Sequence, residues 1–272
     1  MPELPEVETV KETLKRIIIS KKIIDVNVYC DNIVAYPSKE IFVKKLIGQT
    51  IKDIKRRGKW LLFELDDYYL LSHLRMEGKF NWKKTGKRSV HEHIIFVFAD
   101  GQLRYQDTRK FGRMHLIKKD ELYVNKPLSL LGLEPFDEKL TVDYLKQCYK
   151  NKKLPIKSVI LDQSIIAGIG NIYADEILFL SGINPLLKAC CLNDDLLDSI
   201  LKNTRKVLSR AILKGGTTIR SYSSSEGVHG RFQQDLLVHT RAGQKCVICF
   251  RIIIKIKVNG RGTYYCPNCQ KL

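Results

Sequence analysis

Two pairs of cysteines near the end of the chain constrain its fold more than any other feature. Cys246 and Cys249 form one C-x2-C pair, and Cys266 and Cys269 form a second pair after sixteen intervening residues. Each pair presents two thiolates to one ion, and two pairs complete the tetrahedral ligand set that Zn²⁺ prefers. Because protein ligands fill all four positions, the sequence predicts one structural Zn²⁺ ion that does no chemistry.

The charge of the chain indicates the kind of partner. Its 272 residues include 47 Lys and Arg against 29 Asp and Glu, a formal net charge of +18. Such an excess favours a polyanion, and nucleic acid first of all. No apolar run approaches the roughly 18 residues of a membrane span, and the start has no signal-peptide pattern. We therefore expect a cytoplasmic protein that is not secreted, whose cysteines are reduced.

The first half of the chain has the pattern of a sheet with one helix attached. Apolar residues from Val7 to Ile18 recur at helical spacing, after a proline that suits a helix start. Alternating apolar stretches follow, with turns at Asp66-Asp67 and Asp100-Gly101 that predict hairpins. The second half is helical, with Asn171 and Asn193 in positions to cap helices.

The fold class that follows is α+β with two domains. We predict an N-terminal β-sandwich that carries a long N-terminal helix, and a C-terminal helical domain, of the helix-two-turn-helix kind by the resemblance given below, with a zinc finger. A polar stretch rich in Ser and Gly predicts a flexible loop over 217–233. The expected bounds are 1–132 for the sandwich, 133–237 for the helical region and 238–272 for the finger.

The chain also opens with "PELPEVET", and further stretches occur in one order along it: "RRGKWLLF" (56–63), "SHLRMEGKF" (72–80), "DTRKFGR" (107–113), "DQSIIAGIGNIYADEILF" (162–179), "GGTTIRSYS" (215–223) and "GRGTYYCPNCQ" (260–270). With these motifs the whole chain resembles formamidopyrimidine-DNA glycosylase. That family removes oxidised purines (8-oxoguanine and formamidopyrimidines) from DNA and cuts the strand at the abasic site by β,δ-elimination. The resemblance implies a base-excision repair enzyme.

The resemblance also implies which residues do the chemistry. On its own, Pro2 is an ordinary helix lead-in. In the family the N-terminal proline, which matches Pro2, attacks the sugar and forms an iminium (Schiff-base) intermediate. The adjacent acid, which matches Glu3, moves protons, and Lys59 matches a lysine that contacts phosphate beside the lesion and supports catalysis. The expected lesion pocket adds Glu6, Glu77, Arg220 and Tyr222.

The expected partner is double-stranded DNA with an oxidised base or an abasic site, bound by a monomer. A base inside a duplex must be flipped out before it can be reached. By the resemblance, Met76, Arg109 and Phe111 fill the space that it leaves. The remaining expected DNA contacts are Lys157, Asn171 and Arg261, the last at the tip of the finger.

Other readings compete with this one. A sister family, endonuclease VIII, shares the fold but prefers oxidised pyrimidines; its "PEGPE" opening and lack of the filling residues argue against it. A noncatalytic zinc-finger DNA-binding protein leaves "PELPEVETV" unexplained, and a small-molecule enzyme with a catalytic proline needs neither zinc nor the charge. The chain departs from the family pattern at "VHTRAG" (238–243) and at Phe250, where Gly is common, so we expect strain in that turn.

Overall fold

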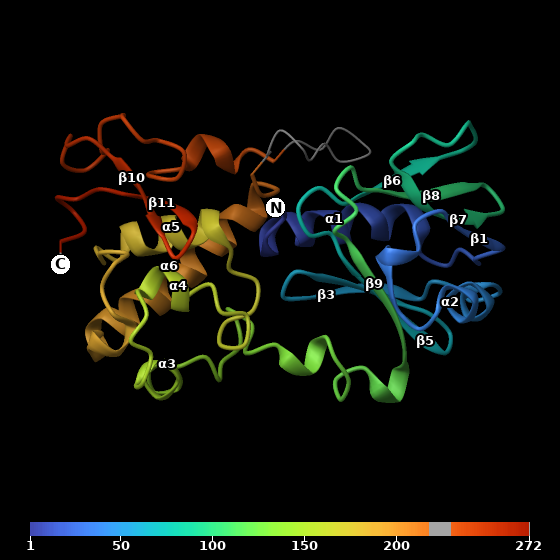
Figure 1. Ribbon diagram of the computed structural model, residues 1–272, viewed down its shortest axis with the longest axis horizontal. Helices are drawn as coiled ribbons and strands as arrows, with labels where there is room; N and C mark the ends of the chain where they lie inside the picture. The colour runs from blue at the N-terminus through green and yellow to red at the C-terminus, as the bar shows by residue number, and fades with distance from the viewer. Residues whose placement is uncertain (218–229, 272) are drawn as a thin grey trace. The chain divides into compact units, whose positions relative to one another are not determined.

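The computed structural model describes residues 1–217 and 230–271 and divides into two compact units (Figure 1). The first unit comprises Met1–Ser129 with Gly215–Gly230, and the second comprises Leu130–Lys214 with Arg231–Leu272. Among the described helices, none is long and apolar enough to cross a bilayer.

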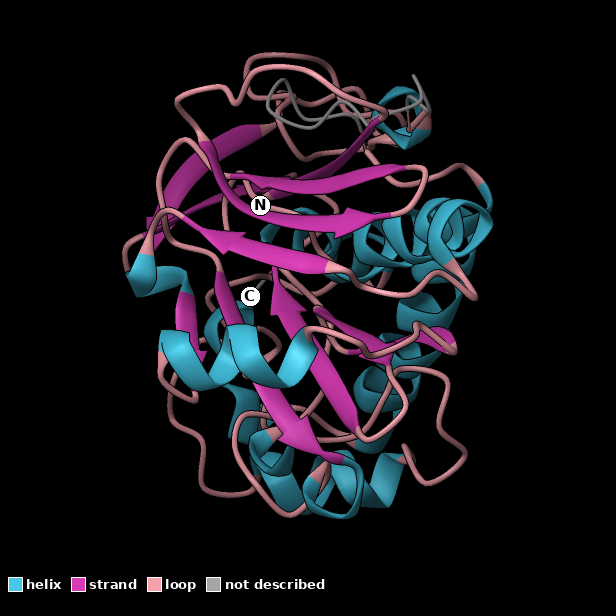
Figure 2. Cartoon of the chain, turned by 90° about the vertical axis from the view of Figure 1, so that its right-hand side faces the viewer, coloured by secondary structure: helices cyan, strands magenta, loops and turns pink. Residues whose placement is uncertain are grey.

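Two sheets form the first unit and lie in separate layers (Figure 2). The predicted hairpins at Asp66-Asp67 and Asp100-Gly101 are confirmed: β4 (Trp60–Glu64) pairs with β5 (Tyr68–His73), and β7 (Glu92–Phe98) pairs with β8 (Gly101–Gln106), both in antiparallel register. The four-stranded sheet has the order β1 (Asp25–Val28), β7 (Glu92–Phe98), β8 (Gly101–Gln106), β6 (Lys79–Lys83). The five-stranded sheet has the order β2 (Val34–Tyr36), β9 (Arg113–Lys118), β5 (Tyr68–His73), β4 (Trp60–Glu64), β3 (Asp53–Arg57).

The predicted N-terminal helix is α1 (Leu4–Ile18), which follows the cap residue Glu3. Pro5 is its second residue rather than its first, a position where a missing N–H is equally harmless because the first turn donates no intrahelical bonds. Its apolar stripe, including Val7 and Leu14, is buried in one core with residues of both sheets. A second helix, α2 (Lys39–Leu46), is absent from the prediction although Ser38 caps it. Short 3₁₀ turns complete the unit: η1 (Asp31–Ile33), η2 (Lys119–Glu121) and η3 (Leu128–Leu130).

Two loops of the first unit cross between the sheets at the same end. Residues 74–78 lead from β5 to β6, and residues 107–112 lead from β8 to β9. His73 and Arg113, where the loops meet the larger sheet, are direct register partners. Lys79 and Gln106, where they meet the smaller sheet, are also partners. The topology therefore places the two loops side by side.

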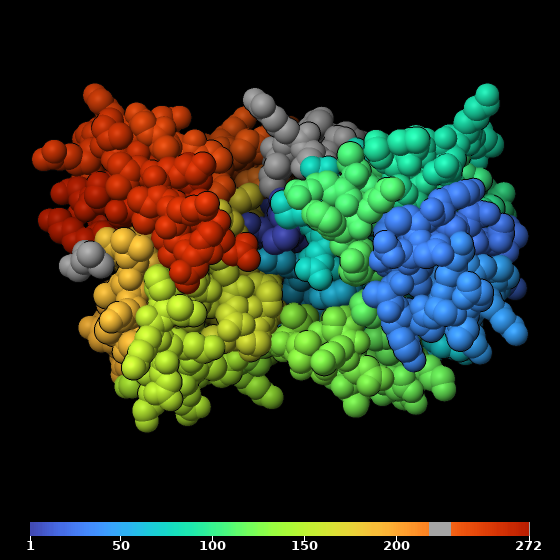
Figure 3. All heavy atoms as spheres, in the orientation of Figure 1, coloured from blue at the N-terminus to red at the C-terminus, as the bar shows by residue number. Residues whose placement is uncertain are grey.

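The second unit combines helices with a small hairpin, which confirms the α+β class. Asn193 caps α6 as predicted, its side chain accepting from the N–H of Leu196 at 3.0 Å. The finger shares a buried cluster with Phe179 of α5 (Asn171–Leu180), and the C-terminal residues, in red, lie beside yellow residues of the same unit in Figure 3. The elements are α3 (Val142–Tyr149), α4 (Ile156–Val159), α5 (Asn171–Leu180), η4 (Ala189–Cys191), α6 (Asp194–Leu213), η5 (Phe232–Asp235), β10 (Ile254–Val258) and β11 (Arg261–Tyr265).

Candidate active site and metal centre

The start of the chain is covered to an unusual degree for a charged terminus: Met1 is partly buried and the next two residues are buried. Pro2 and Glu3 are both buried, ahead of the first turn of α1. Glu6, three residues on, accepts a hydrogen bond from the backbone N–H of Glu3 at 2.8 Å. This local bond holds the first residues in a fixed direction at the positive end of the helix.

Several ionisable side chains surround the terminal amino group. The pKa of the Met1 amino group is lowered, first by burial, while the carboxylates of Glu3 and Glu6 oppose that shift. The charge of Lys59 lowers this pKa further, and Glu77 raises it. Five residues predicted from the sequence therefore lie at the chain start or act on its amino group: Pro2, Glu3, Glu6, Lys59 and Glu77.

Lys59 reaches this environment from a tight turn. It lies between β3 and β4 beside Gly58, whose φ of +56° favours glycine. Although it carries a charge, Lys59 is only 6% exposed. A buried ammonium in this position lowers the proton affinity of any neighbouring amine.

Glu6 contributes a second connection that the sequence did not reveal. Its Oε1 accepts from the backbone N–H of Thr217 at 2.7 Å and from the Thr217 hydroxyl at 3.1 Å. A Cβ atom on Gly216 would lie 2.6 Å from the same oxygen, and Gly216 has a φ of +76°. Glu6 therefore ties the chain start to residues 215–217. Arg220 and Tyr222 lie outside the described residues.

His73 is a further site neighbour that sequence reasoning missed. Burial lowers the pKa of His73 to about 3, helped by the charges of Arg75 and Lys59. The ring is therefore neutral, and its Nδ1 accepts from the backbone N–H of Arg75 at 3.0 Å. Its place at the end of a strand, just before "LRM", is a signal that could have found it.

The predicted filling residues lie on the two crossing loops. Met76 is 38% exposed on loop 74–78, and Phe111 is 47% exposed on loop 107–112. Arg109 stacks on the ring of Phe111, with its guanidinium carbon 4.7 Å from the ring centroid. Exposed apolar side chains beside a guanidinium suit insertion between bases.

The predicted DNA contacts of the second unit have different environments. Arg261 is exposed at the start of β11, after a turn in which Asn259 and Gly260 have φ values of +44° and +78°. Asn171 does not cap α5, since Gly170 is the cap residue and Asn171 is the first helical residue. Its side-chain amide instead donates to the carbonyl of Gly262 at 2.8 Å, because the finger hairpin packs beside the helix start.

Lys157 is fully buried in a polar network. Its ammonium donates to the carbonyl of Asn171 at 2.9 Å and to Asp175 Oδ1 at 2.5 Å. The other oxygen of Asp175 lies 2.7 Å from His239 Nδ1 and accepts from the N–H of Tyr264 at 3.3 Å. This buried charge pair holds α4, α5 and the finger together.

The four cysteines gather as the sequence predicts. Their Sγ atoms lie within 4.8 Å of one another, with 3.8 Å between Cys246 and Cys269 and 3.4 Å between Cys249 and Cys266. A tetrahedral zinc site with Zn–S bonds of about 2.3 Å has sulfur–sulfur edges of about 3.8 Å. The donor set and its geometry therefore fit one Zn²⁺ ion. With four thiolates, the ion has no open position for chemistry.

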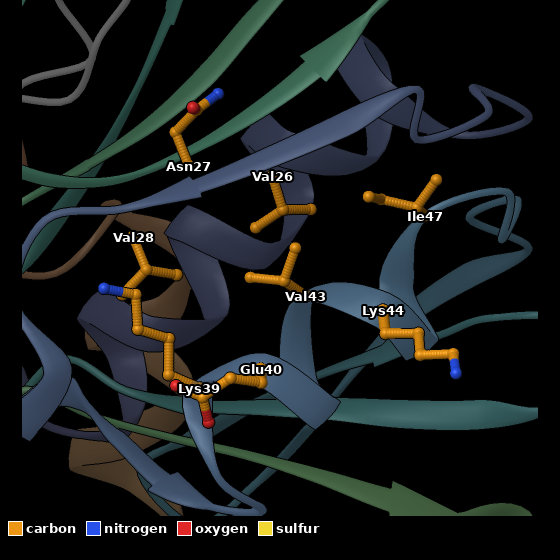
Figure 4. Close-up of a pocket in the computed structure, with 8 residues that line it drawn as sticks. All are labelled: Val26, Asn27, Val28, Lys39, Glu40, Val43, Lys44 and Ile47. Atoms are coloured by element: carbon orange, nitrogen blue, oxygen red, sulfur yellow. The ribbon is translucent and has the colours of Figure 1, made fainter.

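A surface hollow lies between β1 and α2 in the first unit (Figure 4). Val26, Val43 and Ile47 line it together with Lys39 and Lys44. None of the predicted site residues is among its lining residues.

Comparisons with known protein families give consistent matches along the whole chain. Residues 1–114 match the formamidopyrimidine-DNA glycosylase N-terminal domain, and residues 131–223 match the formamidopyrimidine-DNA glycosylase H2TH domain. Residues 243–272 match the zinc finger found in FPG and IleRS. The zinc centre predicted from the cysteine spacing is thus confirmed by both geometry and family.

Whole relatives are similar over nearly their full length. A formamidopyrimidine-DNA glycosylase of Shouchella clausii is 48% identical over 99% of both chains, and one of Oceanobacillus iheyensis is 45% identical over 99% of this chain and 98% of its own. Among solved structures, a Lactococcus lactis FPG variant in complex with Fapy-dG-containing DNA is 40% identical, with a TM-score of 0.95 and full coverage of both chains. The same enzyme bound to abasic-site DNA gives a TM-score of 0.94 at 40% identity, over 99% of this chain and 100% of that one. On domain order, length and identity together, the chain belongs to the formamidopyrimidine-DNA glycosylase family.

Proposed function

We propose that the chain is a base-excision DNA glycosylase and abasic-site lyase that removes oxidised purines with Pro2 as its nucleophile. The observation that carries the proposal is the buried chain start, where Glu3, Glu6, Lys59 and Glu77 all act on the terminal amino group. When Met1 is removed, the secondary amine of Pro2 becomes that terminal group. Family membership supplies the substrate class, since a related enzyme is solved with Fapy-dG-containing DNA and with abasic-site DNA.

The electrostatics of the chain start favour a nucleophilic amine. An amine attacks only when neutral, and a free α-amino group has a pKa of about 8. Burial and the charge of Lys59 lower the pKa of the terminal amine at this position. The positive end of α1 acts in the same direction. The Pro2 nitrogen is therefore proposed to be neutral at working pH.

The reaction then proceeds through bonds at the sugar. The Pro2 nitrogen bonds to C1′, the bond from C1′ to the damaged base breaks, and the base leaves with the proton that the Pro2 nitrogen gives up. The bond from C1′ to the ring oxygen breaks next, and Glu3 gives that oxygen its proton. The product is an iminium ion, an electron sink that acidifies the C2′ proton. Loss of that proton expels the 3′ phosphate, a second elimination expels the 5′ phosphate, and water releases Pro2.

The proposed division of labour follows the chain. Residues 1–132 carry the chemistry and the filling residues, 133–237 bind the DNA backbone, and 238–272 form the finger. The four thiolates would hold Zn²⁺ and fix the hairpin that presents Arg261. Asn171 and Lys157 are proposed to act on the backbone from the start of α5, directly or through the network that holds it. The proposed substrate is duplex DNA, bound by one copy of the chain. The proposed location is the cytoplasm, at the nucleoid, where chromosomal DNA lies.

Borohydride trapping tests this proposal. Protein whose lack of Met1 has been verified by mass spectrometry is mixed with a duplex that carries one 8-oxoguanine, and borohydride is added. The expected result is a crosslink that peptide mapping assigns to Pro2. A duplex with an oxidised pyrimidine is the parallel arm. Trapping there alone would indicate the specificity of endonuclease VIII, and trapping with neither duplex would overturn the iminium mechanism.

A further inference from the structure

One buried hydroxyl group touches both loops that carry the filling residues. Tyr105, at the end of β8, is fully buried. A Cβ atom on Gly112 would lie 1.7 Å from its hydroxyl oxygen, and a Cβ atom on Gly78 would lie 2.2 Å from it. Gly78 ends the loop of Met76, and Gly112 ends the loop of Phe111. Both loops therefore depend on glycine in order to reach the same atom.

The carboxylate of Asp107 continues this contact into the second loop. It is fully buried, and its Oδ2 accepts from the Tyr105 hydroxyl at 3.4 Å and from the N–H of Gly112 at 2.8 Å. Its Oδ1 accepts from the N–H of Arg109 at 3.0 Å. The carbonyl of Asp107 accepts from His93 Nε2 at 2.9 Å. Asp107 thus fixes both ends of the segment from Arg109 to Gly112.

Met76 and Phe111, two of the three filling residues, each follow a residue in an unfavourable backbone conformation. Arg75, directly before Met76, has a φ of +55°, and Lys110, directly before Phe111, has a φ of +57°. Residues other than Gly, Asn and Asp rarely adopt this left-handed backbone conformation. It persists in a folded protein where the surrounding contacts enforce it. The N–H of Arg75 is held by His73, and Lys110 lies between the two amides that Asp107 binds.

We propose that Tyr105 and Asp107 are positioning residues that hold loops 74–78 and 107–112 as one preformed wedge. Met76, Arg109 and Phe111 then enter the duplex together when a base is flipped. Holding the loops in their inserted conformation removes the ordering cost that two independent loops would add to flipping. The inference rests on the proposed function, because a wedge acts only where a base leaves the stack.

The test compares a substrate that must be flipped with one that has no base to unstack. Tyr105→Phe removes only the hydroxyl, and Asp107→Asn replaces one acceptor with a donor that faces an N–H. Single-turnover excision of 8-oxoguanine is expected to slow by about tenfold or more in each variant, since small displacements of positioned groups have effects of this size. Cleavage of a preformed abasic site and binding of undamaged duplex should stay within about threefold of wild type. A 2-aminopurine beside the lesion should show a correspondingly slower fluorescence change.

Two controls separate the outcomes. Tyr69→Phe removes the hydroxyl of another buried tyrosine of the same unit, which accepts from Lys55 at 3.3 Å, and should excise like wild type. Met76→Ala shortens the wedge itself and should slow excision of 8-oxoguanine by at least as much as the two positioning variants. The positioning role is overturned if Met76→Ala slows excision but Tyr105→Phe and Asp107→Asn do not. It is also overturned if Tyr105→Phe and Asp107→Asn slow abasic-site cleavage as much as they slow excision. If wild-type protein lacking Met1 excises nothing, the proposed function fails and the wedge falls with it.

Discussion

Glu6 shows how a single side chain can serve two parts of a site. One oxygen binds the N–H of Glu3 and the other binds both donors of Thr217. The sequence suggested a pocket-lining acid, and the spacing from Glu3 also suits a capping interaction. The contact with Thr217 spans 211 positions, so no local pattern could have predicted it.

Replacing Glu6 tests this double role. In Glu6→Gln, the amide group must face an N–H at one of its two contacts, and a buried donor left unpaired costs about 1–3 kcal/mol. We expect the free energy of unfolding to fall by about that amount in denaturant titrations. Glu12→Gln, on the exposed side of the same helix, is the matched control and should change it by less than about 0.5 kcal/mol. An equal loss of unfolding free energy in Glu6→Gln and Glu12→Gln would contradict the double role of Glu6.

His73 makes stability depend on pH. Because its pKa of about 3 in the folded protein lies below the ordinary 6.5, the unfolded chain takes up the proton first. Stability is therefore full above pH 6.5 and falls as the pH drops towards 3. At pH 5 the expected loss is about 2 kcal/mol, from about 1.5 pH units at about 1.36 kcal/mol each. His73→Asn keeps an acceptor near Nδ1 but cannot take up a proton. Between pH 7 and pH 5, its free energy of unfolding in urea titrations should therefore fall by about 2 kcal/mol less than that of the wild type.

At the scale of elements, features that depend on local sequence pattern could be predicted, and features that depend on long-range contacts could not. The hairpins at Asp66-Asp67 and Asp100-Gly101 follow from turn residues between alternating strands, so they were predictable. The capping role expected of Asn171 was wrong, because the finger hairpin offers its side chain the carbonyl of Gly262. The burial of Lys157 likewise depends on Asp175, eighteen residues away. Motifs indicate which residues matter, while tertiary packing decides what each one contacts.

The zinc knuckle contains the strained turn that the sequence led us to expect. Phe250 follows the second zinc cysteine, has a φ of +61° and is 71% exposed. The left-handed conformation costs an L-residue about 1–2 kcal/mol. We expect Phe250→Gly to raise zinc affinity about fivefold or more, measured by competition with a chelator at pH 7, because about 1 kcal/mol of strain is relieved. An unchanged affinity would show that the knuckle bears no strain.

At the scale of the whole molecule, the net charge of +18 sets how binding responds to salt. Neutralising DNA phosphates releases counterions, so the logarithm of the binding constant falls linearly with the logarithm of salt concentration. Arg261→Gln should weaken binding to damaged and undamaged duplex alike and reduce the slope by about 1. Fluorescence anisotropy between low and physiological salt measures both slopes. A change confined to damaged DNA would indicate lesion recognition instead of phosphate contact.

Because Pro2 is buried in the folded protein, we expect Met1 to be removed before folding covers the chain start. α1 shares its core with Leu116 of β9, so the chain start is covered only after residues up to Lys118 have been made. At roughly 5–20 residues per second, translation of that stretch takes about 6–24 s. An aminopeptidase working on the nascent chain has this interval in which to expose the proline. If Pro2 is the nucleophile, as proposed, the share of catalytically competent molecules is then set during translation, before the protein first meets DNA.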